Sequence, residues 1–125
     1  MKNVLIIIAV FLLSSVGCAT FGGPLSAKEK VSVKSRVQQG KSLFNANGCL
    51  DCHKVAKKGY PDGISLDDIG RRRTREFLRS HLRDPEAHVK DNMSAFHGDP
   101  NMMPNPNLSE KEVKLVVDYL LTLRH

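Results

Sequence analysis

The C-terminal part of the chain carries the clearest hydrophobic pattern, because apolar residues recur there with helical spacing. One apolar row consists of Val113, Val116, Val117 and Leu120, and a second of Leu115, Tyr119 and Leu123. Ser109 and Glu112, three residues apart, form a capping box that predicts the start of the helix. Only a narrow polar stripe separates the two rows, so we expect this helix to be covered on more than one side.

A first helix is predicted to run from Ser32 or Ser35, both acceptable N-caps, to about Asn45, and Asn47-Gly48 ends it. Its apolar positions at three-and-four spacing are Val33, Val37, Gly40 and Phe44. Glycine inside a helix costs about 1 kcal/mol relative to alanine. A close helix crossing at Gly40 would justify that cost, and a merely tolerated glycine is the alternative that spacing alone leaves open.

A middle helix is predicted from Thr74, which can cap it, to about Arg83. Its inward side chains are expected to be Phe77, Leu78, His81 and Leu82. Pro85 ends it, because the residue before a proline is biased away from the α conformation. The stretches 54–69 and 86–107 contain prolines and lack helical periodicity. We expect both to be ordered loops, and neither shows a strand pattern.

The first residues are typical of an export signal. Lys2 precedes an apolar run over residues 4–16, which is shorter than the roughly 20 residues of a membrane span and suits the core of a signal peptide. Ser15-Val16-Gly17-Cys18 is similar to a bacterial lipobox, although Ser15 stands where leucine is usual. Acylation would also explain why a cysteine stands here, outside the folded domain.

These features predict three segments: a signal peptide at 1–17, a lipidated Cys18 with a flexible tether at 18–33, and a folded domain at 34–125. In this interpretation the domain is lipid-anchored on the periplasmic side of a bacterial membrane. Ordinary secretion, with cleavage near residue 19 or 23, would give a soluble periplasmic protein instead. An uncleaved anchor is a third possibility, and all three place the domain outside the cytoplasm.

Composition limits the function further. The chain has 125 residues, enough for one domain, but only five Phe, two Tyr and no Trp, so a core made of protein alone would be thin. Its net charge of +6 suggests acidic partners and charge-steered encounters. No basic stripe is interleaved with aromatic residues and no DNA-binding motif is present, so nucleic acid is not an expected partner.

The sequence Cys49-Leu50-Asp51-Cys52-His53 is a CxxCH motif, the attachment signature of one covalent c-type haem. Two cysteines three residues apart lie on one face of a helical turn, so both sulfurs can reach the two vinyl groups at one porphyrin edge. His53 would then supply the proximal ligand of the iron. A buried porphyrin would add several kcal/mol to a thin core, and we expect the last helix to pack on both the first helix and the haem.

Two other uses of a CxxC pair are less well supported. A zinc site needs two further ligands, usually from a second cysteine pair, and the chain has only one other cysteine. A redox-active dithiol is expected in a βαβ context, which the sequence around Cys49 and Cys52 does not indicate.

In the order of these features the chain resembles the class I bacterial monohaem cytochromes c over residues 35–123. The resemblance implies a small all-α cytochrome c fold, in which the middle helix and the loops wrap around one haem. It also implies that the N- and C-terminal helices cross where Gly40, Phe44 and Tyr119 meet. That crossing would explain the glycine.

The distal iron ligand of that family is a methionine followed by proline, just before the last helix, and Met103-Pro104 matches it. Thioether ligation opposite histidine raises the reduction potential. Met102, Met93 and His97 are the rival ligands that the chain offers. The remaining histidines are expected to be ordinary polar residues: His81, His88 and His125.

The chain departs from the family in the loop after the haem motif, where Gly63-Ile64-Ser65-Leu66 replaces the usual Gly-Pro-x-Leu. The backbone carbonyl of Ile64 can still accept the proton of the proximal imidazole, since the acceptor is not a side chain. Leu66 would pack on the porphyrin. In the run Arg71-Arg72-Arg73, Arg73 is a candidate for binding a haem propionate, although such a run is also typical of a solvated surface.

Together these features predict an electron carrier rather than an enzyme, because two axial ligands leave the iron no open position for a substrate. Its partners would be redox proteins with acidic docking surfaces, and the lipid would hold it at a membrane. A permanently bound haem subunit of a larger oxidoreductase would use the same residues. A ligand sensor or a peroxidase-like enzyme would need the distal methionine to be absent or labile.

Overall fold

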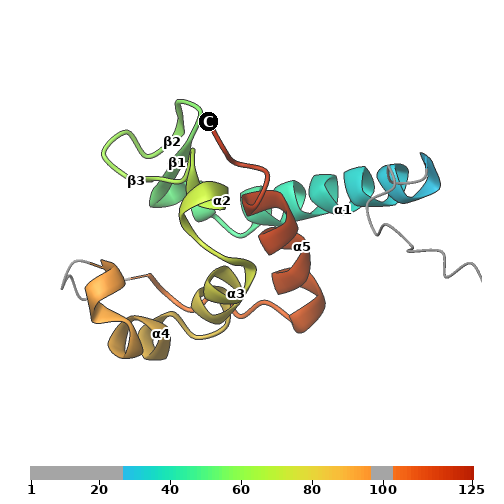
Figure 1. Cartoon of the computed structure of the whole chain (residues 1–125). Helices are drawn as coiled ribbons and strands as arrows, with labels where there is room; N and C mark the ends of the chain where they lie inside the picture. Colours follow the sequence, from blue (N-terminus) through green and yellow to red (C-terminus); the bar gives the residue numbers. More distant parts are fainter. Residues whose placement is uncertain (1–26, 97–102) are drawn as a thin grey trace, which may run out of the picture.

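The computed structural model describes residues 27–96 and 103–125, with side chains from residue 32 onward. It is mostly helical, which confirms the all-α fold class (Figure 1). In chain order the elements are α1 (Ala27–Ala46), η1 (Cys49–Asp51), β1 (His53–Val55), β2 (Lys58–Gly59), β3 (Ile64–Ser65), α2 (Ile69–Arg72), α3 (Arg75–Arg83), α4 (Pro85–Asp91), η2 (Met93–Phe96) and α5 (Glu110–Leu120). Among the described residues, no helix combines the length and the apolar character that a membrane crossing requires.

Helices α1 and α5 cross at Gly40, which confirms the predicted crossing (Figure 1). A Cβ atom at Gly40 would collide with the backbone carbonyl of Leu115 and would come within 3.0 Å of the Cβ atom of Tyr119. Beside this contact, the rings of Phe44 and Tyr119 meet edge to face with centroids 5.4 Å apart, a favoured aromatic geometry. Glycine is therefore required here because the two backbones approach closely, not merely tolerated.

The predicted start of α1 at Ser32 or Ser35 is too late, because the chain is already helical from Ala27. Part of the predicted tether at 18–33 is therefore helix. Neither serine acts as an N-cap: the hydroxyl of Ser32 accepts from Arg36 and that of Ser35 accepts from Gln39, each one helical turn on. The physical reason is that residues 27–31 contain good helix formers and no glycine or proline, so the helix extends beyond its packed part.

The stretch after the CxxCH motif holds three short strands, which corrects the prediction of a loop without strands. β1 lies in the middle, antiparallel to β2 and parallel to β3, with His53 opposite Ile64. The carboxylate of Asp67 fixes this region by accepting from the backbone N–H of Ala56 at 2.6 Å and from the Ser65 hydroxyl at 2.9 Å. Strands of two or three residues are too short for alternation to be visible in a sequence.

Helix α3 has the predicted bounds, and the hydroxyl of Thr74 accepts from the backbone N–H of Phe77 at 3.2 Å. The prediction of a loop over 86–107 was wrong in its first part, because α4 and η2 occupy residues 85–96. Asp84 ends α3 and also caps α4 by accepting from the N–H of Ala87, while Pro85 takes the first helical position. Proline at that position starts a helix as readily as it stops one.

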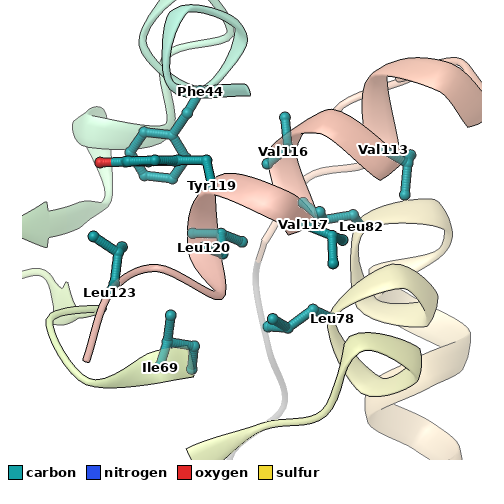
Figure 2. Close-up of a cluster of buried hydrophobic side chains, with 10 residues drawn as sticks. All are labelled: Phe44, Ile69, Leu78, Leu82, Val113, Val116, Val117, Tyr119, Leu120 and Leu123. Carbon is teal, nitrogen blue, oxygen red and sulfur yellow. The ribbon is translucent and has the colours of Figure 1, made fainter. Parts of the chain in front are cut away.

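The hydrophobic core lies on α5, as its two apolar rows predicted (Figure 2). The core side chains come from α1, α2, α3, α5 and the C-terminal segment: Phe44, Ile69, Leu78, Leu82, Val113, Val116, Val117, Tyr119, Leu120 and Leu123. The predicted capping box is present, with Ser109 and Glu112 satisfying each other's backbone N–H groups. Arg79 and Arg83 of α3 both pair with Glu110 at the start of α5, which holds these two helices together at the surface.

Candidate haem-binding site

A cavity of about 390 Å³ opens beside this core, bounded by the end of α1, the strand region, α2, α3 and α5. Most of its walls are apolar. The lining residues are Phe44, Cys49, His53, Ile64, Leu66, Ile69, Arg72, Arg73, Phe77, Leu78, His81, Leu82, Ala95, Phe96, Met103 and Leu120. A largely apolar cavity with a few polar groups is the usual form of a cofactor site.

Of the two cysteines of the motif, Cys49 lines this cavity and Cys52 does not. Gly48 adopts a left-handed conformation (φ 67°) that turns the chain out of α1 into the short helix η1, which begins at Cys49. Both thiols are free; Cys49 is half-buried in the cavity wall and Cys52 is exposed. Burial raises the pKa of the Cys49 thiol; a backbone hydrogen bond opposes this shift in part, and the negative charge of Asp51 adds a smaller increase. The structure therefore brings one of the two predicted attachment residues to the cavity and leaves the other at the surface.

His53 lines the same cavity from the first position of β1. Burial lowers its pKa, and the backbone carbonyl of Ile64, its partner in the β1–β3 register, acts in the opposite direction. Its Nδ1 atom is nevertheless buried, and no group in the described part of the chain meets hydrogen-bond geometry with it. The predicted bond from His53 to Ile64 therefore has the right neighbour, and the bond itself stays a prediction.

The other residues predicted around a porphyrin also reach this cavity. Ile64 and Leu66 both line it, the first with 66 % of its surface exposed at the rim and the second half-buried. Arg73 lines it too, but its guanidinium donates to the carbonyl of Ala95 at 2.8 Å and lies 4.6 Å from the centroid of the Phe77 ring. In this structure the Arg73 guanidinium is therefore bound by a carbonyl and an aromatic ring. Its contact with a haem propionate stays a prediction.

Of the candidate distal ligands, Met103 is half-buried in the cavity wall and packs against the core. Met93 is 42 % exposed on η2 and does not line the cavity. Met102 and His97 lie outside the described residues, as does Cys18. The structure therefore brings together Cys49, His53 and Met103.

His81 is the residue whose role the sequence interpretation missed. It was expected on the inward side of α3 but as an ordinary polar histidine, whereas the structure places it in the cavity wall. Its ring stacks on Phe96 with centroids 5.2 Å apart and lies near Phe77 and His88. Burial, followed by the charges of His88 and His53, lowers its pKa to about 4, and its buried Nδ1 has no hydrogen-bond partner in the described chain. The signal available in the sequence was the position of His81 on the inward side of the middle helix, where a polar side chain needs an explanation.

The residues present fit a haem. The cavity is largely apolar, and the thiol of Cys49, the imidazole of His53 and the thioether of Met103 belong to residues that line it. The Nδ1 atom of His53, unpaired within the described residues, has the Ile64 carbonyl as its neighbour, which leaves the other ring nitrogen for the iron. In the described part of the chain, no three His, Cys, Asp or Glu side chains gather into a metal site. The donor set therefore suits an iron that brings four ligands of its own in a porphyrin better than it suits a zinc ion.

Comparison with known proteins supports this fit. The model of the Cytochrome c family matches residues 37–124, more than half of the chain. The chain is 28 % identical over 102 residues to cytochrome c oxidase subunit 2 of Alkalihalophilus pseudofirmus, covering 80 % of this chain but only 29 % of that protein. It is 28 % identical over 99 residues to cytochrome c-552 of Nitrosomonas europaea, covering 78 % of this chain and 91 % of that protein. No solved structure matches it significantly.

Proposed function

Because the chain belongs to the cytochrome c family, we propose that it carries one electron at a time on a single covalent haem held in the cavity between α3, α5 and the strand region. The observation that carries the proposal is the placing of Cys49, His53 and Met103 in the walls of one apolar cavity. A haem bound there would supply an iron that alternates between Fe(II) and Fe(III).

Each residue has a distinct part in this proposal. Cys49 and Cys52 form the two thioether links, and His53 provides the proximal imidazole, oriented by the neighbouring Ile64 carbonyl. Met103 provides the distal thioether, which raises the reduction potential by favouring Fe(II). Leu66 packs on the porphyrin, and Arg73 binds a propionate in addition to the Ala95 carbonyl.

Electrons would leave through the rim of the cavity where Ile64 is exposed. If His53 and Met103 both bind the iron, no coordination position would be left open, so the proposed role is transfer to docked proteins and not turnover of a substrate. The net charge of +6 favours partners with acidic docking surfaces, since opposite charges steer the encounter.

A second candidate is a haem-carrying part of a larger oxidoreductase. It is favoured by the similarity to a protein named as an oxidase subunit, of which the chain spans less than a third. The same cavity and ligands would serve, and stable co-purification with other subunits would distinguish this role from that of a free carrier.

The purified protein should show a single one-electron wave in a redox titration and, when oxidised, the weak band at the red end of the visible spectrum that methionine–Fe(III) ligation gives. Reduced protein at neutral pH should bind carbon monoxide poorly, because Met103 occupies the distal position. A wild-type protein that lacks the band and binds carbon monoxide readily would contradict the electron carrier and favour a ligand sensor or peroxidase-like enzyme.

We further propose that Cys18 is acylated and tethers the domain to the periplasmic side of a membrane, which would raise its effective concentration near membrane redox complexes. The support is the short apolar run that ends just before this cysteine. Mass spectrometry of the mature protein should find an N-terminal Cys18 carrying lipid. An unmodified chain that starts beyond Cys18 would contradict the anchor and leave a soluble periplasmic protein.

A further inference from the structure

We propose that His81 is a second, nitrogen-donating axial ligand of the iron, which coordinates when Met103 leaves. This inference rests on the proposed function, because it requires a haem between His53 and Met103. In it, the chain has two distal ligands of different chemistry that share one cavity: a thioether in the resting state and an imidazole in reserve.

The position of His81 supports this role. His53 lies on β1 and His81 on α3, two elements that stand apart in Figure 1, and both residues line the cavity. Met103 lines the same cavity, so His81 and Met103 are both placed to reach a group that is held there.

The surroundings of the ring support it as well. His81 is held by the flat faces of Phe77 and Phe96 and by the edge of His88, contacts that fix a ring without using its nitrogen atoms. Its buried Nδ1 atom is left without a partner in the described chain, and an unsatisfied buried polar atom costs about 1–3 kcal/mol. The ring therefore has a buried nitrogen atom that no hydrogen bond from the described residues occupies.

The structure also explains why His81 would be the reserve ligand rather than the resting one. It stands on α3, which is fixed by the Thr74 cap and by the pairs that Arg79 and Arg83 make with Glu110. Met103 lies in a segment without regular structure before α5, so its sulfur can adjust to the iron with less strain. Exchange of thioether for imidazole would lower the reduction potential, because the methionine ligand is what raises it.

The test uses the haem-loaded protein and two variants of the resting ligand, Met103→Ala and the more nearly isosteric Met103→Leu, so that a packing defect in one does not decide the result. Each should lose the red band, stay low-spin by electron paramagnetic resonance, and show a lowered reduction potential. Adding His81→Phe, which retains ring stacking on Phe96, should convert each to a high-spin form. If His81 is bound to the iron in about nine-tenths of the molecules of a single Met103 variant, the corresponding double variant should bind carbon monoxide about tenfold more tightly than that single variant.

His88→Phe is the matched control, since His88 belongs to the same ring cluster but does not line the cavity. Combined with either Met103 variant, it should leave the low-spin spectrum unchanged. A high-spin spectrum in both single Met103 variants, or a low-spin spectrum that persists in the double variants with His81→Phe, would overturn the proposal. Loss of the red band in His81→Phe alone would overturn the reserve role. A wild type without covalent haem would instead contradict the proposed function itself.

Discussion

Replacement of both Cys49 and Cys52 by serine is expected to give a chain from which acid-acetone removes all haem, whereas the wild type should retain it. Serine preserves the size of each side chain but cannot form a thioether, so only the bonds from His53 and Met103 to iron would remain, and acid breaks both. Mass spectrometry of the denatured protein measures the difference directly as the loss of one haem mass from the chain.

The same variant is expected to lose most of its folded structure when produced without haem. Without haem, the largely apolar walls of the cavity would be exposed to water, and the burial that the porphyrin provides would be lost. A loss of several kcal/mol is a large part of the about 5–15 kcal/mol that stabilises a typical domain. Circular dichroism of the double variant without haem should therefore show reduced helix content and no cooperative thermal transition.

The two single variants provide the control. Cys49→Ser and Cys52→Ser should each keep haem on the chain through one thioether, and Cys49→Ser should be the less stable because only Cys49 lies in the cavity wall. Haem that remains bound to the denatured double variant would show that attachment does not depend on these cysteines. The cytochrome interpretation of the motif would then be wrong.

The elements that the sequence predicted correctly are those with local signals. Helix α3 has a capping threonine at one end and the Asp84-Pro85 pair at the other, and α5 has a capping box followed by two apolar rows. In both cases the residues that define the helix lie within a few positions of each other, so no knowledge of the tertiary structure was needed.

The errors arose where a residue has two possible roles or where a pattern is too short. Pro85 can stop one helix and start another, and it does both. Ser32 and Ser35 can cap a helix, but they lie inside one. The three strands hold two or three residues each, and their pairing depends on contacts between β1 and β3 across a turn, which no local pattern contains.

For the site, the motif predicts Cys49, Cys52 and His53, chain order predicts Met103, and the structure places Cys49, His53 and Met103 around one cavity. His81 could not be assigned in the same way, because an inward histidine is compatible with either a polar core residue or a ligand. Only the structure shows that its ring faces the cavity, that aromatic rings hold it, and that its Nδ1 has no partner in the described chain.

Gly40→Ala is expected to destabilise the protein, although helix propensity alone predicts the opposite. In an exposed helix this change stabilises by about 1 kcal/mol. Here the added methyl would collide with the Leu115 carbonyl, and forcing extra atoms into a close contact typically costs about 1–3 kcal/mol. With a cost near the upper end of that range, less the gain in helix propensity, we expect a net loss of about 2 kcal/mol. For a domain of this size that corresponds to a fall in Tm of roughly 8–16 °C, measured by thermal or denaturant unfolding of the haem-loaded protein.

Ser42→Ala is the control, because Ser42 lies on the same helix, is exposed, and bonds only the carbonyl of Gln38 one turn back. It should change stability by less than about 0.5 kcal/mol. Since the atom that Gly40→Ala would strike belongs to the backbone, shortening the side chain with Leu115→Ala should not rescue the first variant. A Gly40→Ala protein as stable as the wild type would show that α1 and α5 can separate without cost, and α5 would then not be fixed against the cavity through this crossing.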